Sequence, residues 1–131
     1  MVVVFTFELE CLPAWQRDFL VEGLALEELR FPAIEEVADA LGGRTPVERI
    51  PTPGERIDGF FEAFWRRRPE ALLDPAIRSA RSTWALLEPG VEERIVTRLA
   101  AALESSAWDG ARGHLRAEDT FADALRLVIF E

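Results

Sequence analysis

The chain has 131 residues, of which 49% are hydrophobic and 30% charged, and 24 acidic against 15 basic residues give a net charge of −9. This length suits one globular domain, and a chain of this size buries roughly two-thirds of its unfolded surface, so we expect a single domain over residues 1–131. Because surfaces that bind nucleic acid are normally basic, the negative charge argues against DNA or RNA as a partner.

Cysteine and histidine occur once each, as Cys11 and His114. One of each is too few for a disulfide or for a Cys/His zinc site within one chain, and we expect a cytoplasmic protein. A Cys–His catalytic pair is left open, although the spacing of the two residues does not favour it. The N-terminus has neither a basic segment nor a long apolar run, so we expect no signal peptide and no membrane span.

The first part of the chain predicts a strand, two helices and a second strand. Residues 2–8 are β-branched and aromatic, which is typical of a strand buried on both faces. Apolar residues at helical spacing over residues 13–30 predict a helix with a break near Gly23, and residues 32–41 predict a short helix. Residues 44–51 alternate apolar and charged side chains between prolines, which favours an edge strand.

The second part predicts several helices and a last strand. Residues 57–65 carry apolar side chains on one helical face, behind a capping-box spacing that begins at Thr52. Residues 74–81 begin with Asp-Pro, which suits a helix cap followed by proline, and Pro89 opens a helix with one apolar face. Residues 125–130 form an apolar strand. The order predicts an α/β fold, with a small three-stranded sheet covered by helices.

One long segment carries a resemblance to a known family. Residues 58–78 read DGFFEAFWRRRPEALLDPAIR and are followed by Ala85-Leu86-Leu87. This segment is similar to the C-terminal region of a group of bacterial S-adenosylmethionine-dependent methyltransferases with a class I, Rossmann-like fold. The similarity continues elsewhere. Residues 2–7 resemble the family's fifth strand and residues 30–43 the helix after it. Residues 103–115 resemble a late helix with its loop, and residues 125–129 the seventh strand. It covers nearly all of this chain but only the back part of the family's domain.

The resemblance implies an α/β fold with a mixed three-stranded sheet, like the C-terminal half of a class I methyltransferase. Strand 125–130 would lie antiparallel beside strand 2–7, and strand 44–51 would form the outer edge. The other side of strand 2–7 would bear a fourth strand that this chain lacks. The glycine-rich turn that holds S-adenosylmethionine in this family is also missing, because the sequence has no Gly-x-Gly. We therefore expect the chain alone to bind no cofactor, and S-adenosylmethionine to be held by another chain.

An apolar strand with an unpaired edge is a template for pairing, so we expect a partner to cover it. Two alternatives are open: a complementary chain that supplies the N-terminal half of the methyltransferase fold, or a second copy in a two-fold dimer. The first makes this chain the substrate-facing or scaffolding half of a split or truncated methyltransferase that is inactive alone. The second makes it a non-catalytic dimerising or binding module derived from that fold.

No residue stands out as catalytic, but seven are candidates for contacting a substrate: Glu8, Glu10, Phe61, Trp65, Arg66, Arg67 and His114. The glutamates follow strand 2–7 at its carboxyl end, where ligands bind in open α/β sheets. The arginines could clamp a carboxylate or phosphate, the aromatic residues could line an apolar pocket, and the histidine could act as a general base. Three of these groups also have a structural interpretation. The arginines could form a solvated helix end, the aromatic residues could pack in the core, and the histidine could order a loop.

Overall fold

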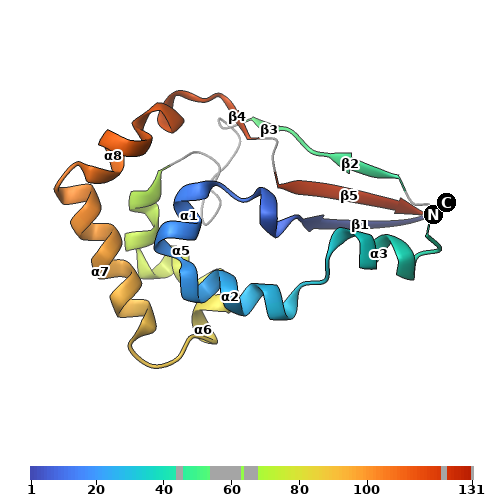
Figure 1. Ribbon diagram of the computed structural model, residues 1–131, viewed down its shortest axis with the longest axis horizontal. Helices are drawn as coiled ribbons and strands as arrows, with labels where there is room; N and C mark the ends of the chain where they lie inside the picture. The colour runs from blue at the N-terminus through green and yellow to red at the C-terminus, as the bar shows by residue number, and fades with distance from the viewer. Residues whose placement is uncertain (44–45, 54–62, 64–67, 122–123, 131) are drawn as a thin grey trace.

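The computed structural model describes residues 1–43, 46–53, 63, 68–121 and 124–130. The molecule is elongated, with a small sheet at one end and most of the helices at the other (Figure 1). Its strands are β1 (Val2–Phe7), β2 (Val47–Arg49), β3 (Thr52–Pro53), β4 (Thr120–Phe121) and β5 (Leu125–Phe130). Its α-helices are α1 (Ala14–Phe19), α2 (Val21–Arg30), α3 (Ile34–Ala40), α5 (Pro75–Ser79), α6 (Ser82–Ala85), α7 (Val91–Glu104) and α8 (Ala107–Arg112). Short 3-10 helices are η1 (Leu9–Cys11), η3 (Pro69–Leu73) and η4 (Gly113–Ala117).

The main sheet has the strand order β1-β5-β2, and β3 and β4 form a second sheet of two strands. The prediction that strand 125–130 lies between the other two strands, with the strand from the 44–51 segment at the outer edge, is confirmed. The resemblance implies a mixed sheet, whereas the part that the structure describes contains only antiparallel pairs. Val128 of β5 lies opposite Val4 of β1 and Val47 of β2, so the central strand is paired on both sides.

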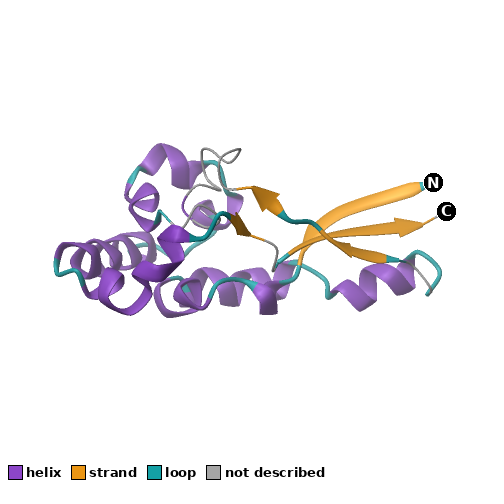
Figure 2. Ribbon diagram, turned by 90° about the horizontal axis from the view of Figure 1, so that it is seen from above, coloured by secondary structure: helices purple, strands orange, loops and turns teal. Residues whose placement is uncertain are grey.

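The two faces of the sheet are covered unequally. Helix α3 lies over one face, as Figure 2 shows, and a Cβ at Gly42 after this helix would lie 3.2 Å from the ring of Phe130. Val128 on that face is 0% exposed, whereas Val3 and Phe5, which alternate to the opposite face, are 47% and 60% exposed. The prediction that the first strand is buried on both faces is therefore wrong for this chain, because no described helix covers the second face.

The hydrophobic core lies among the helices and reaches the carboxyl end of β1 and the start of β5. Trp15 of α1 and Trp108 of α8 are fully buried, and their rings meet edge to face with centroids 5.9 Å apart. Helix α7 buries Val91, Ile95 and Leu99 on one face, so the helix predicted after Pro89 is confirmed. No described helix is both long enough and apolar enough to cross a membrane.

Several boundaries differ from the sequence-based prediction. The break between the first two helices lies at Leu20, with φ −110° and ψ 31°, and Gly23 lies inside α2. The helix predicted over residues 74–81 ends at Ser79, and α6 follows as a separate helix. Its predicted cap is confirmed, because the Asp74 carboxylate accepts a hydrogen bond of 2.8 Å from the backbone N–H of Ala76.

The predicted helix over residues 57–65 lies outside the described residues, apart from Ala63, which is helical and 0% exposed. Thr52, where the predicted capping-box spacing begins, belongs to β3 and pairs with Phe121 of β4. A capping-box spacing depends only on neighbouring residues, whereas this pairing joins segments far apart in the sequence. Gly110 lies within α8, and Gly113 is the C-cap of that helix.

Two glycine-to-alanine changes should shift stability in opposite directions. Gly42 has a φ of +116° and little room for a Cβ beside Phe130, so Gly42→Ala should lower the free energy of unfolding by about 1–2 kcal/mol. Gly23 is helical, and a Cβ added there would lie 3.8 Å from Thr83 Cγ2. Gly23→Ala should therefore raise the free energy of unfolding by about 0.5–1 kcal/mol. Urea unfolding of both variants measures the difference, and equal effects would contradict this account of Gly42.

Candidate functional site

A cleft of about 440 Å³ lies at the carboxyl end of β1. One wall is formed by residues 7–10, where β1 passes into η1. The other wall is formed by Glu28 of α2 and by residues 31–36, which join α2 to α3. Clefts at the carboxyl ends of strands are common ligand sites in α/β proteins, and this one has the size of a small-molecule pocket.

Apolar and acidic side chains share this cleft. The rings of Phe7 and Phe31 lie 5.0 Å apart and are tilted by 57°, which gives the cleft an aromatic wall. Glu36 is engaged at the start of α3, where it accepts a hydrogen bond of 2.8 Å from the backbone N–H of Ala33. The residues that line the cleft include no arginine and no histidine, so its charge is negative.

Glu8 is held in place by a buried arginine. Its carboxylate forms a close ion pair with Arg126 of β5, whose side chain is 4% exposed. The Arg126 guanidinium also donates a hydrogen bond of 2.9 Å to the backbone carbonyl of Leu125. The Cys11 thiol donates to Glu8 Oε2 at 3.4 Å and lies 3.5 Å from Arg126 Nη2. Because Arg126 comes from the neighbouring strand, the pairing of β1 with β5 helps to position Glu8, which lines the cleft.

This environment should make Cys11 a slow nucleophile. Burial and the neighbouring Glu8 raise the pKa of the Cys11 thiol, in spite of the opposing effect of Arg126. At pH 8 we expect iodoacetamide to alkylate Cys11 several-fold more slowly in the folded chain than in the same chain unfolded in urea, because the thiolate is the reacting form. Mass spectrometry over time measures both rates. A folded chain that reacts as fast as the unfolded one would contradict the raised pKa.

Glu10, Glu28 and Glu35 leave their carboxylates exposed at the edge of the cleft. None of the three has an ion-pair partner within the described part of the chain. Arg17 lies nearby in a smaller recess of about 60 Å³, which also includes Glu10 and Glu28. Its guanidinium donates hydrogen bonds to the backbone carbonyls of Leu9 and Glu10. Arg17 therefore stabilises η1 through its backbone.

The structure brings together two of the seven sequence-predicted candidates. Glu8 and Glu10 line the same cleft, whereas His114 lies exposed in η4 and does not line it. The four others lie outside the described residues: Phe61, Trp65, Arg66 and Arg67. Sequence reasoning missed Glu28 and Phe31, and no local pattern marks them, because they reach the cleft only when the end of α2 folds back beside β1.

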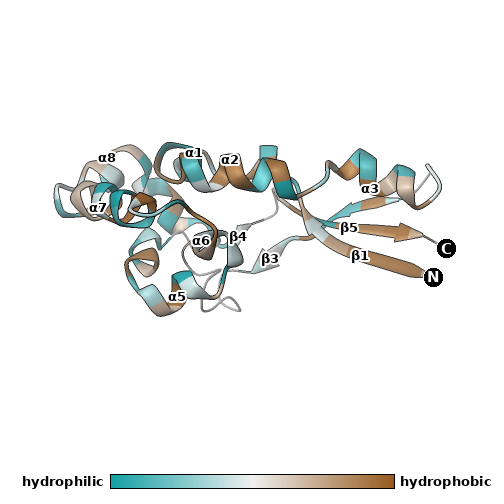
Figure 3. Cartoon of the chain, turned by 90° about the horizontal axis from the view of Figure 1, so that it is seen from below, coloured by the Kyte–Doolittle hydropathy of each residue, from teal (hydrophilic) through white to brown (hydrophobic). Residues whose placement is uncertain are grey.

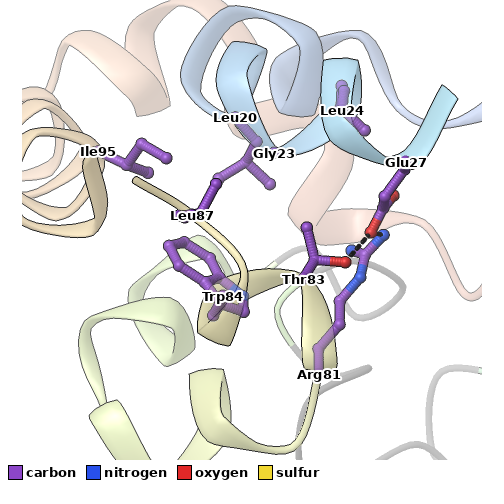
Figure 4. Close-up of a pocket in the computed structure, with 9 residues that line it drawn as sticks. All are labelled: Leu20, Gly23, Leu24, Glu27, Arg81, Thr83, Trp84, Leu87 and Ile95. Carbon is purple, nitrogen blue, oxygen red and sulfur yellow. Dashed lines mark hydrogen bonds and ion pairs between the residues drawn. The ribbon is translucent and has the colours of Figure 1, made fainter. Parts of the chain in front are cut away.

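A second pocket, of about 20 Å³, surrounds a buried ion pair (Figure 4). Glu27 is 1% exposed and pairs closely with Arg81, while the hydroxyl of Thr83 donates to Glu27 Oε1 at 2.7 Å. Burial lowers the pKa of Arg81 to about 10. Glu27 Oε2 has no hydrogen-bond partner among the described residues. The pocket has room for about one water molecule, so this cluster is structural and joins α2 to α6.

The described residues do not fit S-adenosylmethionine. The glycines with positive φ are Gly42, Gly43 and Gly90, which lie beside the ends of α3 and α7, and none of them lines the 440 Å³ cleft. The cleft therefore has no glycine turn whose backbone could approach a nucleoside closely. The smaller pocket does contain Gly23, but its volume of about 20 Å³ excludes a molecule of that size.

No protein-family model matches the sequence, and no curated protein matches it. One solved structure is similar over 98% of this chain, with a TM-score of 0.75 and 26% sequence identity. It is the crystal structure of a protein from Anabaena variabilis ATCC 29413, named "Putative methyltransferase from antibiotic biosynthesis pathway". This chain has a methyltransferase-like fold. The chain spans about half, 54%, of the solved protein.

Proposed function

We propose that this chain is the substrate-facing part of an S-adenosylmethionine-dependent methyltransferase, in which a separate portion holds the cofactor. The observation that carries the proposal is the 440 Å³ cleft at the carboxyl end of β1, within a methyltransferase-like fold. Ligands in open α/β folds bind at this end of the strands. The cleft lacks a glycine cradle but has an aromatic wall and carboxylates, which suits a methyl acceptor better than a cofactor.

The cleft residues would act mainly by positioning the acceptor. The rings of Phe7 and Phe31 would contact its apolar surface, and Glu8, oriented by Arg126, would fix one polar group. Glu10 would accept a proton from the attacking O–H or N–H group or hold a cationic acceptor by charge. Methyl transfer depends largely on holding the nucleophile in line with the methyl group, so these are the contributions required from this side of the site.

Calorimetric titration with S-adenosylmethionine tests the proposal. The chain alone should give no binding heat, whereas a complex with the cofactor-binding portion should bind. The part of the Anabaena variabilis protein outside the match, produced together with this chain, is the probe for that portion. Glu10→Gln should leave the binding unchanged, because we place Glu10 against the acceptor. Tight binding to the chain alone, or no binding to either sample, would contradict the proposal.

One observation favours a second candidate function, a dimerising module without catalysis. Among the residues that the structure describes, β1 pairs with β5 on one side and with no strand on the other, and Val2, Val3 and Phe5 on this strand are exposed. Such a strand can pair with the same strand of a second copy. Sedimentation velocity of the purified chain measures its oligomeric state. The dimerising function requires a stable dimer.

A further inference from the structure

The cleft at the carboxyl end of β1 has an aromatic wall that suits a cation. The rings of Phe7 and Phe31 both line it, and their centroids lie 5.0 Å apart. Each ring already has a guanidinium nearby, since Arg81 lies 6.0 Å from the Phe7 centroid and Arg30 lies 5.7 Å from the Phe31 centroid. An aromatic ring attracts a cation over its face and also packs against apolar groups. The wall therefore suits a molecule that combines a positive charge with an apolar body.

Two exposed carboxylates line the cleft from different elements. Glu10 belongs to η1 on one wall, and Glu28 belongs to α2 on the other. Both residues also line the recess of about 60 Å³ beside the cleft, so they lie where the two openings meet. Figure 3 shows hydrophobic and hydrophilic colour side by side along α2 and α3, the helices joined at this wall. Like charges on opposite walls repel each other, and a cation between them would remove this cost.

The arginines near the cleft are engaged with other groups. Arg17 lines the recess but not the cleft, and it donates hydrogen bonds to backbone carbonyls of η1. Arg126 forms a close ion pair with Glu8. Arg30 donates a hydrogen bond of 3.2 Å to Ser82 Oγ of α6. Within the described part of the chain no basic side chain lines the cleft, so its negative charge is left for a ligand to compensate.

This charge selects among three classes of acceptor, because an acceptor that fills the cleft displaces water from the carboxylates. A neutral acceptor would leave the charges with neither water nor a cation, and an anionic one would add repulsion. We propose that the methyl acceptor carries a protonated amine, held between Glu10 and Glu28, and an apolar body that packs against Phe7 and Phe31. The inference rests on the proposed function, which makes the cleft the site of the acceptor.

An NMR titration of the full chain with three probes of similar shape tests the inference. Phenethylamine is a cation at pH 7, phenethyl alcohol is neutral, and hydrocinnamate is an anion. The amine should bind about tenfold more tightly than the alcohol, and hydrocinnamate should not bind. The amide signals that shift with the amine should belong to residues 7–10 and 28–36, which line the cleft.

Charge-neutralising variants separate the cleft from the general negative charge of the chain. Glu10→Gln and Glu28→Gln should each weaken the binding of phenethylamine about three- to fivefold, and the double variant about tenfold. None of these variants should change the binding of phenethyl alcohol. Glu104→Gln is the matched control, because Glu104 is exposed at the end of α7 and does not line the cleft. This control should change the binding of the amine by less than about twofold.

Three outcomes would overturn the inference: equal affinities for the amine and the alcohol, equal losses in the control and the cleft variants, or no shift of the cleft signals at about 20 mM amine. The calorimetric titration with S-adenosylmethionine is a separate measurement. Cofactor binding by the complex without amine selectivity in this chain contradicts only the inference. Selective amine binding without cofactor binding leaves the cation site standing and contradicts only the proposed function.

Discussion

Replacing Arg81 with methionine should lower the free energy of unfolding by about 3–5 kcal/mol, because it leaves the buried carboxylate of Glu27 without its cation. Glu27 is 1% exposed, and its other hydrogen-bond partner among the described residues is the hydroxyl of Thr83 at 2.7 Å. A neutral hydroxyl compensates a buried charge far less than a guanidinium does.

Urea unfolding followed by circular dichroism measures this loss. Glu27→Met combined with Arg81→Met should recover most of it, since replacing both partners of a buried pair with apolar residues is often neutral. Arg94 is exposed on α7, and Arg94→Met is the matched control, which should change stability by no more than about 0.5 kcal/mol. If Arg81→Met changed stability no more than this control, the ion pair would not be buried as described.

Trp108→Ala should lower the free energy of unfolding by about 3–5 kcal/mol. Trp108 is 1% exposed and meets Trp15 edge to face, with ring centroids 5.9 Å apart. The Arg116 guanidinium also lies 4.8 Å from the centroid of the Trp108 ring, and it forms an ion pair of 2.9 Å with Glu70 of η3. Removing the indole leaves a cavity where α1, α8 and η4 meet and also removes the surface on which Arg116 rests.

Thermal and urea unfolding of the Trp108→Ala variant measure this effect. Leu29→Ala is the matched control, because Leu29 is 86% exposed and should change stability by about 0.5 kcal/mol or less. The double variant with Trp15→Ala should lose less than the sum of the two single losses, since the two rings contact each other. Additive losses would contradict a direct contribution from the edge-to-face contact.

Features that depend on neighbouring residues were predictable from the sequence. Strand 125–130, the buried face of α7 and the cap at Asp74 follow from periodicity and from capping chemistry, which act over a few residues. The break at Leu20 and the pairing of Thr52 with Phe121 were not predictable. They depend on contacts between segments distant in the sequence, and these contacts override local preferences.

The same distinction applies to the candidate site. Glu8 and Glu10 were identified because they follow a strand end, which is a local signal. Glu28 and Phe31 lie at the end of α2 and reach the cleft only through the fold. Arg126 is distant in sequence from Glu8, and their ion pair exists because β1 and β5 pair antiparallel.

The fold class and the lack of a Gly-x-Gly turn follow from residue types and their spacing alone. The burial of β1, in contrast, depends on the packing of distant segments. A run of valine and phenylalanine predicts an apolar strand, but it does not say which side is covered. In this chain α3 covers one face and β5 pairs with one edge, so Val3 and Phe5 stay exposed. Burial depends on which other segments pack against the strand, and that information lies outside the strand's own residues.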